Sequence, residues 1–502
     1  MRITNQMVSG SSMRNMQKSM GRVNKLTEQM STGKKIQAPS EDPVIAIRAL
    51  KLRTTVDQLD QYKNKNIPDA MSWMDTTQTS IQNVMDRLQD VYFYCVEGAT
   101  DSFSTPDRYT IINNLRAIKE AIYSEGGTTY AGRYLFSGYK TETNLIFQDM
   151  DSKAGLSYEI TQKFSGSDIE VKNVVLNPIN PDDIDDILTA GGLAGGTYIN
   201  PTASSAYKMR LAYNDLDGVI PTISIGTPPV AYAVTPVQKS LSDLDCYDPG
   251  DNDIFFIPET GELIFGKDVY NDLKQETDIT VEYEKSRFNV GDLRPEMYFD
   301  CVRHALQKDG SIQTINFTVN EAGQEIQYEV NFNQMITVNV EGREIIQHDM
   351  GNRIEDLAIA VQEMLDAEST IAKLKRLLDD PQYKNDDDAV ELINTMLEDA
   401  EVELAIRREN MQKLFGNNIT NFQVFGEEVG SVQAKVATNF AKLEMIQERV
   451  KEQLTNFKEL RSVNEDVETE EAAIDLYSAE LVYQASLITT SSVMQKTLLD
   501  YL

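Results

Sequence analysis

The stretch MSTGKKIQAPSEDP, residues 30–43, interrupts a helical sequence pattern near the start of the chain. Gly33 suits the left-handed conformation in which helices commonly end, and Lys34 and Lys35 suit the negative end of a helix dipole. Pro39 disfavours helix before it, and Ser40 is a good N-cap followed by two acidic residues. The stretch therefore predicts a helix end, a short extended link and a new helix start. The predicted break consists of Gly33, Pro39, Ser40, Asp42 and Pro43.

The Gly-Lys pair in this stretch does not form a phosphate-binding loop. Such a loop needs a second glycine five residues earlier and a serine or threonine after the lysine. Those positions hold Glu28 and Lys35. The sequence therefore gives no support for nucleotide binding here.

Apolar residues at alternating steps of three and four lie on both sides of the break, which is the spacing of coiled coils. After the break, this spacing runs from Ile67 to Cys95, and Gln78 is the one polar residue in it. Before the break, the same spacing predicts a seam through which the first helix assembles with partners. The seam residues assigned there are Met13, Met16, Met20, Val23 and Met30.

The C-terminal part repeats the heptad spacing from Val429 to Leu460. Residues 431–502 contain neither glycine nor proline, so no local signal forces a break in that helical segment. The seam residues assigned to the last helix are Leu481, Leu487 and Leu498. Two further helices are predicted at 354–378 and 390–404.

The middle of the chain has a different pattern, in which apolar and polar residues alternate as they do in strands. FFIPETGELIFG, residues 255–266, predicts two strands around a Thr-Gly turn, and residues 328–345 predict strands with polar turns. Residues 131–350 are therefore expected to form a β-rich insertion between two helical halves.

Charge supports pairing of the two ends. Residues 1–60 contain ten basic and five acidic side chains, whereas residues 462–502 contain one basic and eight acidic side chains. The predicted fold class is a multidomain α+β protein, in which a discontinuous N- and C-terminal coiled-coil bundle carries a central β-rich insertion. The predicted domains are a terminal coiled coil (1–60 with 462–502), a helical core (61–130 with 351–461) and a β-rich outer domain (131–350). The outer domain is expected to consist of one or two subdomains.

Composition excludes several classes of partner. The net charge of -32 argues against nucleic acid and against anionic membrane surfaces. No apolar run is long enough to cross a membrane, and the first residues have no apolar core typical of a cleaved signal. Cys95, Cys246 and Cys301 lie far apart, which fits neither a disulfide framework nor a metal cluster.

No constellation of residues predicts catalysis, a cofactor or a metal. The two histidines, His304 and His348, lie among polar residues and are expected to be solvated, and no H-E-x-x-H motif occurs. Cys95 is expected to be a small buried apolar residue. Acidic clusters at 181–186, 249–253 and 379–388 lack the order of an EF-hand loop and are predicted to be acidic turns, with calcium binding as the alternative.

Three motifs resemble the flagellin superfamily. MSTGKKIQAPSEDPVIAIRALKLR, residues 30–53, is similar to the N-terminal signature of that superfamily. GRYLFSGYKTETN, residues 132–144, resembles a turn typical of its hook–filament junction members. EEAAIDLYSAELVYQASLITTSSVMQKTLLDYL, residues 470–502, resembles the C-terminal helix, and its ending is closer to hook-associated proteins than to filament flagellins.

This resemblance implies a structural, non-enzymatic role. A junction member would assemble with copies of itself into a ring, between hook-associated protein 1 and the flagellin filament. It would be served by a flagellar export chaperone, and it would leave the cell through the flagellar type III export system without a cleaved signal. Its expected location is the extracellular flagellum.

Three rival functions remain open. A flagellin, which forms the filament itself, belongs to the same superfamily. A secreted binding module that displays the middle of the chain is a rival from a different class. An enzyme is the weakest rival, because no nucleophile–base pair or metal set is present.

Overall fold

The structure is a computed structural model that describes residues 5–100, 105–148, 155–195, 198–306, 311–319 and 325–494. It divides into two compact units. The first unit combines residues 1–71, 328–336 and 441–502, and the second combines residues 72–327 and 337–440. Helices dominate both ends of the chain and strands dominate the middle, which confirms the predicted fold class.

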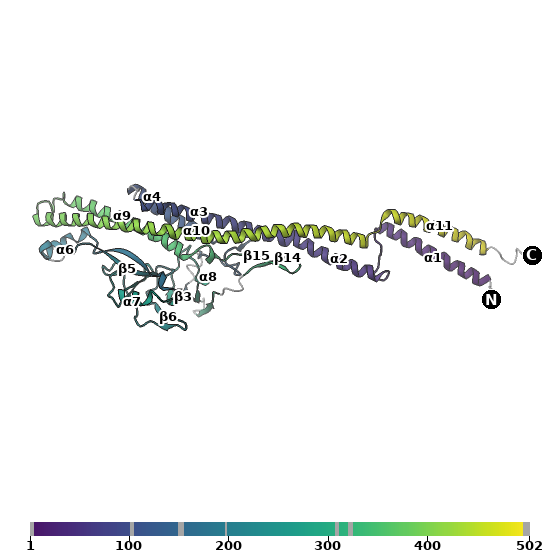
Figure 1. The fold of residues 1–502 in the computed structure, drawn as a ribbon, viewed down its shortest axis with the longest axis horizontal. Helices are drawn as coiled ribbons and strands as arrows, with labels where there is room; N and C mark the ends of the chain where they lie inside the picture. Colours follow the sequence, from purple (N-terminus) through teal and green to yellow (C-terminus); the bar gives the residue numbers. More distant parts are fainter. Residues whose placement is uncertain are drawn as a thin grey trace, which may run out of the picture. The chain divides into compact units, whose positions relative to one another are not determined.

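The first unit is built from helices of both chain ends. Helix α1 (Asn5–Thr32) packs against α11 (Thr469–Met494), and the two run antiparallel, as Figure 1 shows. Helix α2 (Pro43–Gln61) lies beside the last part of α10 (Asp387–Glu465). A π-helical turn, Tyr62–Asn66, then leads into α3 (Ile67–Ala99).

A β-hairpin tip is fixed to this π-helical turn. The tip belongs to strands β14 (Gln327–Asn331) and β15 (Gln334–Thr337). Glu329 accepts a hydrogen bond from the Tyr62 hydroxyl at 2.8 Å, and its carbonyl accepts one from the Asn66 amide at 2.8 Å. The turn thus presents two polar side chains to one residue of the hairpin.

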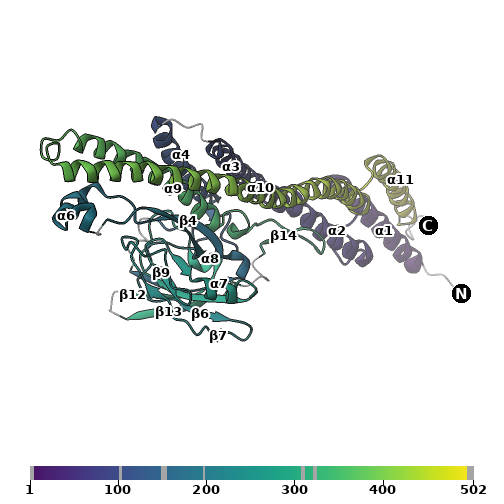
Figure 2. The same cartoon turned by 60° about the vertical axis from the view of Figure 1, so that its left-hand side comes forward.

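The helical part of the second unit contains most of α3, α4 (Thr105–Glu125), α9 (His348–Leu377) and most of α10. Helix α4 packs against α9, and α9 runs beside α10, as Figure 2 shows. The apolar seam of α3 is buried at part of the predicted positions: Ile81, Leu88 and Cys95 are at 1% exposure or less, whereas Met85 and Tyr92 are half-buried. Cys95 is a buried free thiol, as expected.

Two sheets, in which nearly all strand pairs are antiparallel, form the β region of the second unit. One has the strand order β4-β5-β10-β9-β8 and the other β13-β12-β3-β11-β6-β7. Their apolar faces share one core, to which Phe256, Phe265 and Tyr158 contribute. The first sheet consists of β4 (Glu170–Leu176), β5 (Thr202–Arg210), β8 (Val237–Gln238), β9 (Ile254–Ile257) and β10 (Glu262–Phe265). The second consists of β3 (Leu156–Phe164), β6 (Thr222–Ile225), β7 (Val230–Ala231), β11 (Ile279–Lys285), β12 (Asp300–Leu306) and β13 (Ile312–Phe317).

Short elements complete the second unit. These are β1 (Thr129–Tyr130), β2 (Arg133–Tyr134), α6 (Ile184–Thr189), α7 (Lys267–Leu273) and α8 (Pro295–Tyr298), with 3-10 turns at Gly166–Asp168, Pro181–Asp183, Gly192–Gly195 and Gly342–Glu344. Helix α6 packs its apolar side chains against α9 and α10, so the acidic cluster at 181–186 covers part of an apolar contact.

The prediction that both histidines are solvated is wrong for His348. Its ring packs against the rings of Tyr213, Tyr298 and Phe299, with centroid distances of 4.7, 4.6 and 5.2 Å. Burial lowers the pKa of His348 to about 3, so the ring is neutral at physiological pH. The polar neighbours of His348 in the sequence gave no sign of these aromatic partners, which come from distant segments.

The predicted hairpin at 255–266 is confirmed and depends on one glycine. Strands β9 and β10 pair antiparallel, with Glu262 opposite Ile257, and Gly261 has a φ of 68°. A Cβ at this position would lie 2.1 Å from the Tyr213 carbonyl oxygen.

We expect Gly261→Ala to destabilise this hairpin by at least about 1–2 kcal/mol, because alanine resists positive φ and its methyl group would displace backbone. Hydrogen exchange of the β9 and β10 amides measures the loss. Gly132→Ala is the matched control, since Gly132 has a φ of 79° but open space around the missing Cβ. Equal losses in the two variants would contradict the part assigned to the close contact.

Candidate functional site

The two chain ends meet in a short backbone pairing, which we call the paired link (residues 33–35 with 465–467). The amide of Lys35 donates to the carbonyl of Glu465 at 2.7 Å, and the amide of Val467 donates to the carbonyl of Gly33 at 2.9 Å. Lys34 and Asp466 form the antiparallel bridge between these bonds. Gly33 has a φ of 69°, the left-handed conformation predicted for the end of α1.

Ion pairs fasten the side chains of the paired link. Arg53 of α2 donates two hydrogen bonds of 2.7 Å to the carboxylate of Glu465, whose side chain is 5% exposed. Lys34 lies 2.5 Å from Asp466 and 3.4 Å from Glu465. The hydrogen bonds from Arg53 and Lys34 lower the pKa values of Glu465 and Asp466, respectively. Both carboxylates are therefore charged at neutral pH.

Helix α2 begins at Pro43, and its N-cap is Asp42 rather than the predicted Ser40. The Asp42 carboxylate accepts hydrogen bonds from the amides of Val44 at 3.0 Å and Ile45 at 3.1 Å. This cap puts Pro43 at the first helical position, where its missing N–H has no cost. Pro39 and Ser40 lie in a turn before the cap.

The contact between α1 and α11 combines small side chains with larger apolar ones. The less exposed positions of each helix repeat at steps of three and four, which is the spacing of an antiparallel coiled-coil seam. On α1 these positions are Ser9, Ser12, Met16, Ser19, Val23, Leu26 and Met30. On α11 they are Ala472, Leu476, Ala479, Tyr483, Ser486 and Thr490.

Some of the predicted seam residues lie in this contact, and others are exposed outside it. Met16, Val23 and Met30 lie within it, whereas Met13 and Met20 are 42% and 48% exposed. Leu481 and Leu487 are 50% and 40% exposed. Leu498 lies outside the described residues. The small residues of this seam were not predicted, because the prediction rested on large apolar side chains, although their heptad spacing is visible in the sequence.

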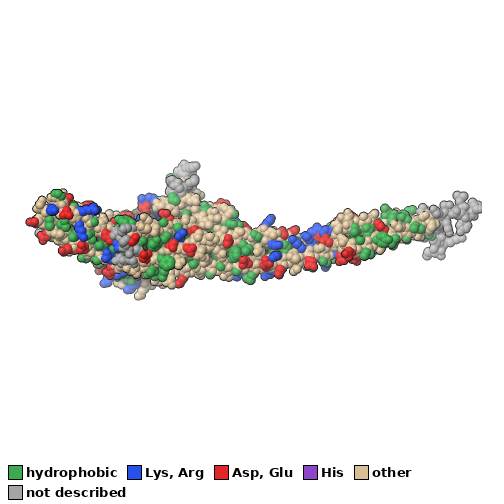
Figure 3. Space-filling model, turned by 90° about the horizontal axis from the view of Figure 1, so that it is seen from above, with side chains coloured by type: hydrophobic (Ala, Val, Ile, Leu, Met, Phe, Trp, Pro, Cys, Tyr) green, Lys and Arg blue, Asp and Glu red, His purple; other side chains and the backbone are tan. Residues whose placement is uncertain are grey.

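Helix α11 carries a second stripe of large apolar side chains, which we call the outer stripe: Ile474, Tyr477, Leu481 and Ile488. These residues follow heptad spacing with one polar position, Gln484, and their exposed fractions run from 50% to 72%. Hydrophobic side chains are visible on the surface of this part of the chain in Figure 3. A helix with two such stripes can pack against two partners at once, and α1 covers one of them.

The described residues contain no group of three or more His, Cys, Asp or Glu side chains arranged to hold a metal ion. None of their helices has the length and apolar content that a bilayer crossing requires.

Comparison with known proteins identifies a family to which the N-terminal part of the chain is similar. Residues 3–141 match the bacterial flagellin N-terminal helical region. This match covers α1, the paired link's first strand, α2, α3 and the turn at 132–138 that resembled the superfamily.

Two curated relatives narrow the similarity to one kind of protein. The chain is 29% identical over 174 residues to flagellar hook-associated protein 3 of Escherichia coli, which covers 33% of this chain and 53% of the relative. It is 29% identical over 170 residues to flagellar hook-associated protein 3 of Salmonella typhimurium, covering 32% and 51%. The chain thus spans about half the length of the curated relatives it matches. These matches confirm the resemblance to the flagellin superfamily and, within it, to the hook–filament junction protein.

Among solved structures, the flagellar hook-associated protein-3 of Legionella pneumophila is similar, with a TM-score of 0.30 and 12% sequence identity. That comparison covers 82% of this chain and 98% of the other. By their names, these relatives are components of the bacterial flagellum.

We expect Glu465→Gln to loosen the paired link by about 1 kcal/mol, because Arg53 is half exposed and water screens its ion pair. The folded pKa of Glu465 lies below its unfolded value of about 4.3, so its contribution is present above that pH and is lost as the pH falls through the folded pKa. Hydrogen exchange at the Lys35 and Val467 amides reports the change.

The matched control is Glu459→Gln, at an exposed position of the same helix. The control should keep the exchange rates and the acid dependence of the unmodified chain. An equal effect of the two variants would contradict the role assigned to Glu465.

Proposed function

We propose that the chain is a structural subunit of the bacterial flagellum that assembles through α1 and α11. The observation that carries this proposal is the outer stripe of α11, which repeats at heptad spacing and has no partner among the described residues. Heptad-spaced apolar residues are the contact pattern that helices use to pack on other helices. In this proposal the partners are copies of the same chain and neighbouring flagellar subunits.

The energetics favour several neighbours rather than one. Burying each large apolar side chain of the outer stripe stabilises a contact by about 1.5–3 kcal/mol, so its four members contribute about 6–12 kcal/mol. Bringing two molecules together costs about 4–15 kcal/mol of lost freedom. One contact of this kind is near balance, so stable assembly requires a closed or repeating arrangement in which each subunit contacts more than one neighbour.

The terminal pair is also poorly suited to independent stability. About half of its seam positions hold serine, alanine or threonine, which contribute little apolar area, while the large side chains of the outer stripe remain in water. We propose that residues 1–60 with 462–502 act as a terminal assembly domain that gains most of its stability from neighbours. The proposed assembly residues are Met13, Met16, Met20, Val23, Met30, Leu481, Leu487 and Leu498.

The finer role that we propose is the junction between hook and filament. The subunit would form a ring by self-assembly, with hook-associated protein 1 on one side and flagellin on the other. A flagellar export chaperone would accompany it to the type III export system, and its location would be the extracellular flagellum. The support is the similarity to flagellar hook-associated protein 3 together with the C-terminal helix motif. Flagellin, the filament subunit, is the alternative role.

We expect the double variant Leu481→Ser/Ile488→Ser to abolish incorporation into flagella while the purified monomer keeps its stability within about 0.5 kcal/mol, because both side chains are exposed. Immunolabelling of flagella and thermal melting of the monomer measure the two effects. Leu306→Ser is the control, since Leu306 is 61% exposed on β12. Normal incorporation of the double variant would sink the proposal.

Deletion of the gene distinguishes the junction role from the flagellin role. Loss of a junction subunit should leave hooks intact and release unpolymerised flagellin into the medium, because the filament has no base on which to grow. Loss of a flagellin should remove the filament without releasing another flagellin. Electron microscopy of the cells and immunoblotting of the medium give the two readouts.

A further inference from the structure

A groove lies between α2 and the last turns of α10, beside the paired link. It has a volume of about 580 Å³, and we call it the basic groove (Lys35, Ile45, Arg48, Leu52, Leu460, Val463 and Asn464). Four of these residues are apolar, two are cationic and none is acidic. All of them belong to the first unit, so the groove is formed within one compact body.

The apolar side of the basic groove lacks cover among the described residues. The heptad series that predicted the seam of α10 includes both Val450 and Leu460. Val450 is buried, whereas Leu460 is 54% exposed, and Val463, one turn further along, is 66% exposed. The apolar seam of α10 therefore continues past the point at which the rest of the unit covers it.

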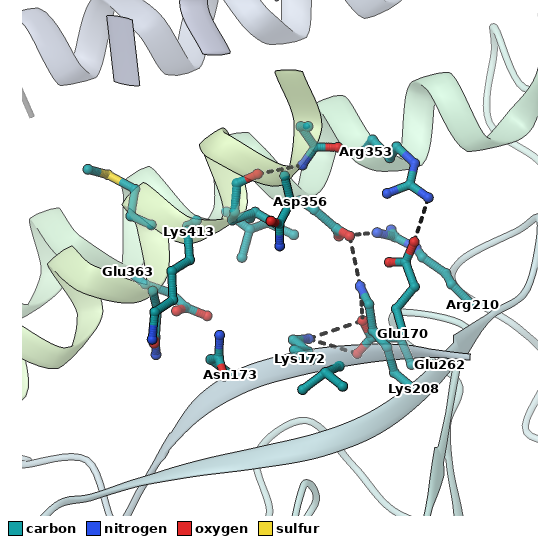
Figure 4. Close-up of a pocket in the computed structure, with 18 of the residues that line it drawn as sticks. Glu170, Lys172, Asn173, Lys208, Arg210, Glu262, Arg353, Asp356, Glu363 and Lys413 are labelled. Atoms are coloured by element: carbon teal, nitrogen blue, oxygen red, sulfur yellow. Dashed lines mark hydrogen bonds and ion pairs between the residues drawn. The ribbon is translucent and has the colours of Figure 1, made fainter. Parts of the chain in front are cut away.

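In the second unit, cations that pack between strands and helices are paired with carboxylates. A cavity of about 420 Å³ is lined there by charged side chains of β4, β5, β10 and α9, as Figure 4 shows. Lys172 lies 2.9 Å from Glu262, and Lys208 lies 3.0 Å from Asp356. Each partner offsets part of the cost of removing the other from water.

The cations around the basic groove have no such partners. Lys35 donates to the Val463 carbonyl at 2.6 Å, and neither Lys35 nor Arg48 forms an ion pair among the described residues. Lys51, one turn beyond Arg48 on α2, is exposed and is likewise unpaired within the described part of the chain. In a chain with a net charge of -32, three unpaired cations beside an apolar groove favour an acidic occupant.

Helix α11 has the complementary composition, because it contains acidic residues but no lysine or arginine. Its acidic residues all lie in its first half and are Glu470, Glu471, Asp475 and Glu480. They are exposed, and none of them forms an ion pair among the described residues. Glu470 lies four residues before Ile474 and Glu480 lies three residues after Tyr477, so both acids border the outer stripe. An apolar helix face bordered by acids fits an apolar groove bordered by cations.

The two surfaces also match in length. Ile45 and Leu52 of the groove are seven residues apart on α2. Ile474 and Leu481 of the outer stripe are seven residues apart on α11. Each pair therefore spans two helical turns, about 10 Å at a rise of about 1.5 Å per residue. The acidic half of the outer stripe is long enough to cover the groove.

Helix α11 of the same chain does not fill the groove. It packs against α1, and these two helices lie on the opposite side of the paired link from α2 and the end of α10 (Figure 1). The acidic half of α11 begins at Thr469, two residues after Val467 of the paired link, so its place along α1 is fixed from its start. An α11 that occupies the groove therefore belongs to another copy.

We propose that the basic groove binds the first half of α11 from a second copy of the chain. This inference rests on the proposed assembly through α1 and α11, and it names the surface on which the outer stripe packs. The two surfaces of the contact differ, so each copy offers its α11 to one neighbour and its groove to another. Such a head-to-tail contact repeats from copy to copy and closes into a ring when the rotation between copies allows closure.

The test is oxidative cross-linking between two full-length variants, Val463→Cys in the groove and Tyr477→Cys on the outer stripe. The native cysteines are buried, so the introduced thiols are the accessible ones in the folded chain. A disulfide forms only where two Cα atoms approach within about 7 Å. We expect the mixed dimer to exceed each homodimer severalfold on a non-reducing gel, whereas random collision gives only twice as much.

Charge reversal tests the electrostatic part of the contact. Arg48→Glu/Lys51→Glu in the groove variant should lower the yield of mixed dimer severalfold, because like charges then face each other. Glu470→Lys/Glu480→Lys in the partner variant should restore the yield. All four side chains are exposed, so thermal melting of the monomers should not change.

Met445→Cys is the matched control for Val463→Cys, because Met445 is 68% exposed on the same helix and does not line the groove. With the Tyr477→Cys chain it should give mixed dimer only at the yield of random collision. The same low yield from the Val463→Cys chain overturns the proposal, and so does a yield that the charge reversals leave unchanged.

The proposed function has its own test in Leu481→Ser/Ile488→Ser. If that variant is excluded from flagella while the mixed dimer is absent, the outer stripe packs on a different surface, and only the groove contact is wrong. Normal incorporation of that variant contradicts the proposed function, whatever the cross-link shows.

Discussion

The structure of the chain ends depends on two backbone hydrogen bonds between residues 33–35 and 465–467. They join segments from opposite ends of the sequence, and they lie at the point where α1 and α10 stop and α2 and α11 start. The left-handed conformation of Gly33 directs its carbonyl toward the amide of Val467. The Glu465 carboxylate forms ion pairs with Arg53 and Lys34. Backbone groups that leave a helix need new partners, and each side of the paired link supplies them to the other.

This constraint explains why the C-terminal helical segment is broken without glycine or proline. Helix α10 ends at Glu465 and α11 begins at Thr469, although no residue between them forbids a helix. The amide of Val467 bonds to Gly33 instead of to a residue of its own helix. The tertiary hydrogen bonds and the buried carboxylate of Glu465 therefore override a local preference that would continue the helix.

Side chains of different size lie in the seam between α1 and α11 and on the outer stripe of α11. Small residues such as Ser12 and Ala479 lie in the seam between α1 and α11, while Tyr477 and Ile488 lie in water. A monomer selected for its own stability would bury the larger side chains, since burial free energy follows apolar area. In the second unit, the free-energy cost lies in burying charged groups. Glu262 and its neighbouring lysines are removed from water, and their mutual ion pairs offset this desolvation.

The sequence by itself determined the classes of element and several of their limits. Period-3.5 spacing identified α3 and its buried Cys95, alternation with a Thr-Gly turn identified the β9–β10 hairpin, and Gly33 marked the end of α1, because these signals act within a few residues. Tertiary structure decided which stripe of α11 is covered, where α10 stops, and that His348 lies among aromatic rings. It also brought Lys172, Glu262 and Asp356 to one cavity. These outcomes depend on partners that are distant along the chain, and a local pattern contains no information about which of them will be adjacent in space.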